Sequence, residues 1–487
     1  MHTIDLIVFL VFTLGVVVFG CSFFRKGSTA DEFTSAGHSI PGWVVGMSIF
    51  ATYVSSISYI GYPGKAFAAD WNAFVFSLSI PIASFFAARY FVPFYRKSGS
   101  VSAYTFLEEK FGAWARLYAS ACYLLTQIAR MGSILYLLAV PMYILMGWDI
   151  HAVIILTSIG IIIYSMLGGL KAVIWADAIQ GIILIGGAVL CLCLLLCRMP
   201  EGPMQAFDLA VNAPAGNKFS LGEFSLDLTT STFWVCLIYG IFINLQNYGI
   251  DQNYVQRYHA AKTDADARFS ALFGGYLFIP VSALFFLIGT VLYSYYTANP
   301  QLLPAEIQAK PDYVFPYFIV SELPTGVRGL LIASIFAAGM STVSTSVTSA
   351  ATIVLTDYFK PFFKGMTDRH HLAVLRFSSA IVGVLGIVVA IAMLSVESII
   401  DAWWKLSSIF SGGMLGLFLL GAYSKRTTST QAAVATVLGV LVVVFITFGQ
   451  SLLHLSPLLH VNLSIALGTL TLFLTGWLLA TCKKKSK

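Results

Sequence analysis

Residues 168–177 read GGLKAVIWAD, and the chain then stays almost purely apolar as far as Cys197. The carboxylate of Asp177 therefore stands just inside a segment that is long enough to cross a membrane. Ionisable side chains inside such segments are costly, and they usually belong to an ion or substrate pathway. A loop carboxylate that favours the start of a helix is the structural alternative. Both interpretations place the stretch at the beginning of a membrane-spanning helix.

A second polar stretch interrupts another apolar run, and it reads STVSTS at residues 341–346. Helical spacing puts Ser341, Ser344 and Thr345 on one face, with Thr342 one step around the helix. A single hydroxyl in a membrane helix usually bonds to its own preceding turn or to a neighbouring helix. As a group beside unwound backbone carbonyls, however, these hydroxyls match the oxygen ligands that a hard cation takes. The string therefore predicts a sodium site if an unwound segment lies next to it.

The composition is that of a polytopic membrane protein built from helices. Of the 487 residues, 58% are hydrophobic and 10% are charged, whereas a soluble domain has about 25% charged residues. No hydrophilic stretch is long enough for a further domain, so we expect residues 1–487 to form a single transmembrane domain. The basic residues are spread over the loops, so the net charge of +6 does not indicate nucleic-acid binding. Nothing indicates an obligate protein partner.

Thirteen segments are apolar and long enough to be membrane-spanning helices. They are residues 3–22, 41–65, 72–95, 113–147, 150–169, 173–198, 231–256, 269–296, 327–359, 372–396, 400–424, 430–450 and 460–482. With the N-terminus outside, twenty Lys and Arg residues, Arg257 among them, fall on the inside and five fall on the outside. This bias follows the positive-inside rule and predicts a multi-pass protein of the cell membrane with a cytoplasmic C-terminus.

Two of these segments carry polar and helix-breaking residues, and they lie five segments apart. The second segment has polar residues at 51–58, followed by Gly and Pro, and the seventh has polar residues at 244–249. Transporters built from inverted five-helix repeats have one discontinuous helix in each repeat, and the breaks meet near the middle of the membrane. The spacing predicts a first repeat at 41–198 and a second at 231–424, with an extra N-terminal helix at 3–22 and two C-terminal helices at 430–482.

Arg130 lies in the middle of the fourth segment, where a guanidinium must be paired or must face water. One interpretation is a structural pair with a distant carboxylate. The other is a fork for a substrate carboxylate, which arginine binds through two parallel hydrogen bonds. In the second case, hydroxyl donors would complete the pocket, and the candidates are Tyr53, Ser55, Ser58 and Ser77.

Two other classes of membrane protein fit poorly. A proton-pumping subunit needs a chain of Lys, Glu and His residues along the middle of the membrane, and this sequence offers too few. A membrane-embedded enzyme needs a metal-binding His pair or a nucleophile beside a base, and no such pair occurs within the segments. We therefore expect a transporter and no enzymatic activity.

The chain resembles the sodium:solute symporter family, whose core is the inverted-repeat fold shared with the leucine transporter. One family marker begins with Gly-Gly and ends with Asp and Gln, and here it runs over residues 168–180. A second marker reads DQNYVQR at residues 251–257. Within the family, the chain looks like the bacterial sodium/sialic acid symporters. This likeness rests on FAT at 50–52, SSI at 55–57, Asp70-Trp71, Arg130 and IFAA at 335–338.

The resemblance implies specific sites. It implies one sodium ion among the backbone of Ala51, Val54 and Ala338 and the hydroxyls of Ser341 and Thr342. It implies a second sodium ion among Asp177, Ser341, Ser344 and Thr345, and a substrate against Tyr53, Ser55, Ser58 and Arg130. The subgroup carries a small hydroxyl residue in place of Tyr53 and a glutamine in place of Ser77. We expect sodium-driven uptake of a small organic anion, sialic acid (N-acetylneuraminate) or a related carboxylate, with a neutral sugar or polyol as the alternative substrate.

Overall fold

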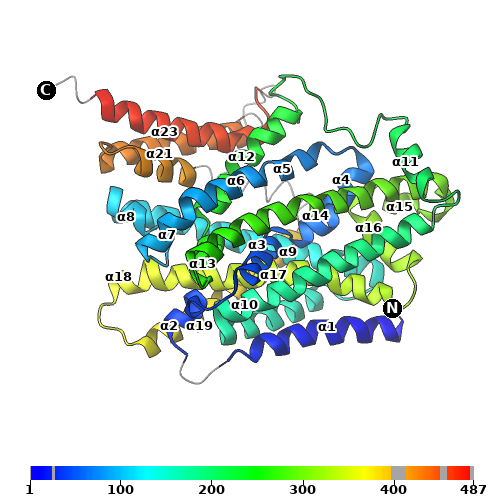
Figure 1. Ribbon diagram of the computed structural model, residues 1–487, viewed down its shortest axis with the longest axis horizontal. Coiled ribbons are helices and arrows are strands. Elements are labelled where there is room, and N and C mark those ends of the chain that lie inside the picture. The colour runs from blue at the N-terminus through cyan, green and yellow to red at the C-terminus, as the bar shows by residue number, and fades with distance from the viewer. Residues whose placement is uncertain (1, 25–27, 396–412, 450–457, 483–487) are drawn as a thin grey trace.

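The fold is described from a computed structural model that covers residues 2–24, 28–395, 413–449 and 458–482 (Figure 1). Within these ranges the chain is helical and its long helices lie side by side along the long axis (Figure 1). The helices of the first half are α1 (Thr3–Cys21), α2 (Ala30–Ser35), α3 (Gly42–Tyr53), α4 (Ser56–Ala68), α5 (Val75–Leu78), α6 (Ile80–Phe86), α7 (Val92–Ser98), α8 (Thr105–Phe111), α9 (Ala113–Met146), α10 (Ile150–Cys197) and α11 (Pro203–Val211). Those of the second half are α12 (Phe233–Ile250), α13 (Gln252–Ala260), α14 (Asp264–Ala298), α15 (Ala305–Gln308), α16 (Pro311–Glu322), α17 (Val327–Ile353), α18 (Lys360–Phe362), α19 (Asp368–Ala392), Gly413–Tyr423, α21 (Ser429–Val444) and α23 (Ser464–Cys482).

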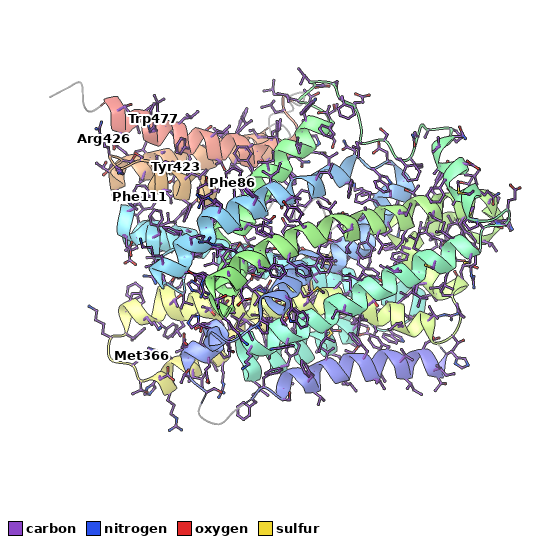
Figure 2. All side chains as sticks on the ribbon, in the orientation of Figure 1. Phe86, Phe111, Met366, Tyr423, Arg426 and Trp477 are labelled. Carbon is purple, nitrogen blue, oxygen red and sulfur yellow. The ribbon has the colours of Figure 1, made fainter. Side chains whose placement is uncertain are left out.

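Ten helices of the described chain are long and apolar enough to cross a membrane, or eleven if the bent pair α3–α4 is one span. Their outer surface carries large apolar side chains, as a lipid-facing surface does. Figure 2 shows Tyr423 and Trp477 at the edge formed by α21 and α23, where 76% and 48% of their surfaces are exposed. Part of the predicted segment 400–424 lies outside the described residues, so the number thirteen stays a prediction.

α10 contains two of the predicted segments, joined at Gly169. It has 48 residues, or about 72 Å of helix, more than twice the roughly 30 Å of a hydrocarbon core. Gly169 has φ +58° and ψ −155°, outside the helical range. Trp148, just before α10, packs against Phe9 near the start of α1, and Gly168 lies against Gly20 at the end of α1. The second half of α10 then lines a groove along α1, and Gly187 packs against Ser334 near the start of α17, so the chain reverses at the break.

The predicted break in the second segment is confirmed. α3 ends at Tyr53, α4 begins at Ser56, and the two helices are bent by 57°. Val54 and Ser55 between them have extended backbone, with ψ of 106° and 176°. Because the last carbonyls of α3 lack helical partners, they can bond to groups on other helices.

The seventh segment is also discontinuous, but its break lies at Asp251 and not within residues 244–249. Asp251 has extended backbone between α12 and α13. Asn244 lies within α12, and its side-chain amide donates to the Ser79 hydroxyl (2.8 Å). Gly240 allows the same close packing, since a Cβ there would come within 2.4 Å of Ser79 Oγ. These small and polar residues therefore fix α12 against the segment from α5 to α6 and do not unwind it.

The extra N-terminal helix is fastened to α17. The carboxylate of Asp5 is fully buried and accepts hydrogen bonds from the backbone N–H groups of Gly326 (2.7 Å) and Gly329 (3.2 Å). These groups belong to the first turn of α17, where backbone donors have no helical partner. Asp5 thus caps α17 from another helix, with the negative charge that a helix N-terminus favours.

Candidate functional site

α17 forms the centre of the molecule and carries the predicted hydroxyl string. Every residue from Leu331 to Ile353 is buried. A helix buried on all sides must satisfy its polar side chains within its own turns or from its neighbours. The hydroxyls on α17 therefore show which surrounding groups it faces.

The first predicted sodium set comes together where α17 meets the end of α3. The hydroxyl of Ser341 donates to the carbonyl oxygen of Ala51 (2.8 Å), across 290 residues of sequence. The hydroxyl of Thr342 donates to the carbonyl oxygen of Ala338, one turn earlier in α17 (3.2 Å). Val54 lies in the break that follows Ala51 and is also buried. Hydrogen bonds thus link Ala51, Ala338, Ser341 and Thr342, and Val54 follows Ala51 by three residues.

Two residues of the second predicted set, Asp177 and Thr345, lie at a buried ion pair. Asp177 Oδ2 accepts from Arg257 Nη2 (2.7 Å) and from the Ser48 hydroxyl (2.7 Å). The same Nη2 donates to the Thr345 hydroxyl (2.6 Å), and Arg257 Nε donates to Ser48 (2.7 Å). Asp177 Oδ1 is buried and has no hydrogen-bond partner. Ser344 does not join this ring, because its hydroxyl donates to the Ser341 carbonyl oxygen (3.0 Å).

Two sequence interpretations are wrong at this point. The loop interpretation of Asp177 fails because the residue is fully buried inside α10. The assignment of Arg257 to an inside loop fails because its side chain is 1% exposed and lies in α13. Arg257 belongs to the marker at residues 251–257, and its guanidinium also donates to the carbonyl oxygen of Asn253 (2.7 Å).

The predicted substrate residue Tyr53 ends α3 and lies in a cluster of aromatic rings. Its ring centroid is 6.0 Å from that of Tyr248, 5.8 Å from that of Tyr254 and 5.0 Å from that of Phe278. The side-chain amide of Asn247 donates to its hydroxyl (3.1 Å). Tyr53 therefore presents both a ring face and a polar tip at the break, and Asn247 is a partner that the sequence did not suggest.

Arg130 adjoins the same break from α9. Its Nη2 donates to the carbonyl oxygen of Thr52 (3.1 Å), the residue between Ala51 and Tyr53. Arg130 forms no direct ion pair with any residue that the structure describes, but its charge acts on the buried carboxylate of Asp251, so the interpretation as a structural pair stays untested. Its remaining donors are available to another acceptor.

The three predicted serines take different places. Ser55 lies in the break and Ser58 in the first turn of α4, and both are buried. Ser77 in α5 shares a hydrogen bond with Ser282 of α14 (2.7 Å). Ser282 follows Phe278 by one turn of α14, and Phe278 packs against Tyr53.

A polar network missed by sequence reasoning joins α9, α13 and α17 next to the ion pair. The hydroxyl of Tyr123 lies within hydrogen-bond distance of both Asn253 Oδ1 (3.1 Å) and the Ser349 hydroxyl (2.7 Å). Gln127 Oε1 accepts from Asn253 (3.2 Å) and from Ser346 (2.8 Å). The network holds α13, and hence Arg257, against α17.

The family model of the sodium:solute symporter family matches residues 33–439. The chain belongs to this family. It is therefore a sodium-coupled symporter of a small solute, a multi-pass membrane protein and not an enzyme. The symporter is 31% identical to the sodium/sialic acid symporter NanT of Aliivibrio fischeri, with 99% of this chain and 94% of that protein covered. It is 34% identical to the sodium/sialic acid symporter SiaT of Proteus mirabilis, with 90% and 88% covered.

The comparison with solved structures gives the fold. A substrate-bound, outward-open structure of a Na+-coupled sialic acid symporter has a TM-score of 0.92 to this chain. The two share 31% sequence identity, and the match covers 99% of this chain and 98% of the other. The predicted fold class, an all-helical membrane protein of the leucine-transporter type, is confirmed.

Proposed function

We propose that this symporter takes up sialic acid (N-acetylneuraminate) or a closely related carboxylate, driven by the sodium gradient. One observation carries the proposal: three consecutive residues at the end of α3 contact both predicted sites. The carbonyl of Ala51 bonds to Ser341, the carbonyl of Thr52 bonds to Arg130, and Tyr53 begins the aromatic cluster. An ion that fixes this short segment also positions the groups that would face the substrate. The two sialic acid symporters similar to this chain favour the carboxylate over a neutral sugar or polyol.

The first sodium ion is proposed to bind between the α3–α4 break and α17. Its ligands are the carbonyls of Ala51, Val54 and Ala338 and the hydroxyls of Ser341 and Thr342. Sodium would replace the direct bond between Ser341 and Ala51, so the same oxygens would hold the two helices together through the ion. Neutral ligands suit a site that must also release its ion, because they add no fixed charge.

A second sodium ion is proposed at Asp177, Ser341, Ser344 and Thr345. Asp177 Oδ1 supports this site because it is a buried carboxylate oxygen without a partner. The guanidinium of Arg257 already neutralises the formal charge of Asp177. A cation there would therefore compete with Arg257 for the carboxylate or share it.

The substrate carboxylate is proposed to bind Arg130, with Tyr53, Ser55, Ser58 and Ser77 lining the pocket. Two sodium ions entering with one carboxylate move one net positive charge inward. At a membrane potential of 100 mV this charge contributes about 2.3 kcal/mol. Transport would be electrogenic, and an inside-negative potential would accelerate it.

We also propose the topology that the basic residues predict, with the N-terminus outside and the C-terminus in the cytoplasm. The two inverted repeats are proposed at 41–198 and 231–424. The breaks at Val54–Ser55 and at Asp251 support these repeats, since each falls in the first helix of its repeat.

Uptake into proteoliposomes tests the function. Radiolabelled N-acetylneuraminate is added with an inward sodium gradient, and in parallel with potassium replacing sodium. We expect uptake only with sodium, and faster uptake when a potassium-diffusion potential makes the inside negative. Uptake that does not depend on sodium would contradict the proposed coupling. Accumulation of a different carboxylate, without uptake of N-acetylneuraminate, would contradict the proposed substrate.

Arg130→Lys tests the carboxylate contact. Lysine keeps the charge but loses the planar fork, and a hydrogen bond to a charged group is worth about 1.5–3 kcal/mol. We expect the substrate concentration for half-maximal uptake to rise roughly 10- to 100-fold. Arg89→Lys is the matched control, since Arg89 is exposed and should tolerate the change. Equal substrate affinities in the two variants would show that Arg130 does not bind the substrate carboxylate.

A further inference from the structure

A charged cavity lies beside the end of α1, away from the proposed ion and substrate sites. It has a volume of about 320 Å³ and lies between the segment after α1, α2, the break of α10 and α19. Lys171, just after the break, and Arg376, in α19, contribute two positive charges to its wall. Three chain connections with the same predicted orientation meet here, on the side that the basic residues predict to be cytoplasmic.

The two basic side chains have unused hydrogen-bonding capacity. Neither Lys171 nor Arg376 forms an ion pair with any carboxylate in the described ranges. Arg376 Nε is buried without a hydrogen-bond partner, and the guanidinium lies 5.3 Å from the ring centre of Phe24. The wall also includes Glu32, but one of its carboxylate oxygens accepts the backbone N–H of Thr29 in a capping box. The cavity wall thus carries two positive charges and one carboxylate that is already hydrogen-bonded, so the cavity favours an anion.

An apolar groove continues from this cavity along α1. It is lined by Ile7, Val8, Val11, Phe12, Gly15, Val16 and Phe19 of α1 and by Ile179 and Ile183 of α10. The rings of Phe19 in the groove and Phe23 in the cavity wall are 5.2 Å apart, so the groove leads to the cavity. From Ile7 to Phe19 the helix rises about 18 Å, close to the roughly 15 Å of one hydrocarbon leaflet.

We propose that this combined site binds one anionic phospholipid. The phosphate of its headgroup lies between Lys171 and Arg376, and one acyl chain lies in the groove between α1 and the second half of α10. The occupant is argued from shape and charge together. A soluble phosphate would use the cavity and leave the groove empty, whereas a zwitterionic lipid would fill the groove without the net charge that the cavity favours.

Gly15 allows the groove to be blocked without disturbing the fold. A Cβ at this position has nothing within 4 Å, and Gly15 lines the groove, so the side chain of Gly15→Leu starts in open space there. Gly186→Leu is the matched control, because Gly186 is equally open but lies outside the groove. For the headgroup, Lys171→Gln and Arg376→Gln each remove one charge, and Lys262→Gln removes an exposed charge that does not line the cavity.

The test is the thermal unfolding of purified symporter in neutral detergent during titration with lipid. Phosphatidylglycerol, phosphatidylcholine with the same acyl chains, and inorganic phosphate are compared. We expect phosphatidylglycerol to stabilise the wild type at the lowest concentration. Each charge removal should raise the concentration needed by roughly fivefold, which corresponds to about 1 kcal/mol. Gly15→Leu should reduce the thermal stabilisation by both lipids. The two control variants, Gly186→Leu and Lys262→Gln, should behave as the wild type.

Three results would overturn the proposal. The headgroup site would be refuted if the two lipids stabilised the wild type equally. It would also be refuted if phosphatidylglycerol stabilised Lys171→Gln and Arg376→Gln as well as it stabilises the wild type. Stabilisation by inorganic phosphate as large as that by phosphatidylglycerol, with no effect of Gly15→Leu, would assign the cavity to a soluble anion and exclude a lipid.

Discussion

Replacing Arg257 by glutamine should destabilise the symporter in sodium-free solution and strengthen its response to sodium. Arg257 donates hydrogen bonds to Ser48, Asn253, Asp177 and Thr345. Removing one partner of a buried ion pair costs about 3–5 kcal/mol, because the other charge is left uncompensated. Such a loss is a large part of the roughly 5–15 kcal/mol that separates a typical folded protein from its unfolded state.

Sodium should restore part of this loss. If sodium binds beside Asp177, it supplies the positive charge that Arg257→Gln removes. A ligand at 100 times its dissociation constant adds about 2.7 kcal/mol of stability. The variant should therefore gain more from sodium than the wild type does, and it should reach half of that gain at a lower sodium concentration.

The assay is thermal unfolding in detergent over a sodium titration, with choline chloride keeping the ionic strength constant. The double variant Asp177→Asn/Arg257→Gln is the control, because it has neither charge. It should be more stable than Arg257→Gln alone, and its sodium response should be smaller. The reasoning is refuted if Arg257→Gln is as stable as the wild type without sodium, or if sodium stabilises both proteins equally.

Three further predictions follow from other contacts. Ser341→Ala removes a proposed sodium ligand, which should cost about 1–2 kcal/mol of sodium binding. The sodium concentration for half-maximal uptake should therefore rise roughly 5- to 30-fold. Ser334→Ala, on the same helix, is the control and should change that concentration little. Asp5→Ala leaves the first turn of α17 uncapped and should lower the free energy of unfolding by about 0.5–2 kcal/mol without changing the sodium dependence, as thermal unfolding and uptake would show. Burial, aided by nearby His38 and Arg96, lowers the pKa of His259 to about 4. Since the unfolded chain takes up this proton near pH 6.5, stability should fall between pH 6.5 and 4 by up to about 3 kcal/mol, and His259→Gln should flatten that dependence in unfolding measurements at pH 7.5 and pH 5.

The sequence predicted the membrane helices well because hydropathy and length depend on local composition. It also located the break at Val54–Ser55, where polar residues lie next to Gly and Pro. It misplaced the second break, because the small and polar residues of α12 serve packing against Ser79, which no local pattern reveals.

The pairings between distant residues were harder to predict. Asp177 and Arg257 are 80 residues apart in the chain, and counting basic residues treats every arginine in the same way. The hydroxyl string on α17 was recognised as a group, but its members diverge. Ser341 reaches α3, Thr345 reaches Arg257, and Ser344 bonds to its own helix. Which hydroxyl points where depends on the neighbouring helices, and the sequence of α17 alone does not contain that information.

The cap that Asp5 places on α17 makes α1 a reporter of the buried helix. A Cβ at Gly329 would come within 2.4 Å of the Asp5 carbonyl oxygen, so the two backbones are in close contact and cannot slide past each other. Any displacement of the first turn of α17 during a transport cycle must carry the start of α1 with it. Leu14 on α1 faces outward, with 57% of its surface exposed, and it does not line the groove between α1 and α10. A spectroscopic label at this accessible position would follow the motion of a helix that no label could reach directly.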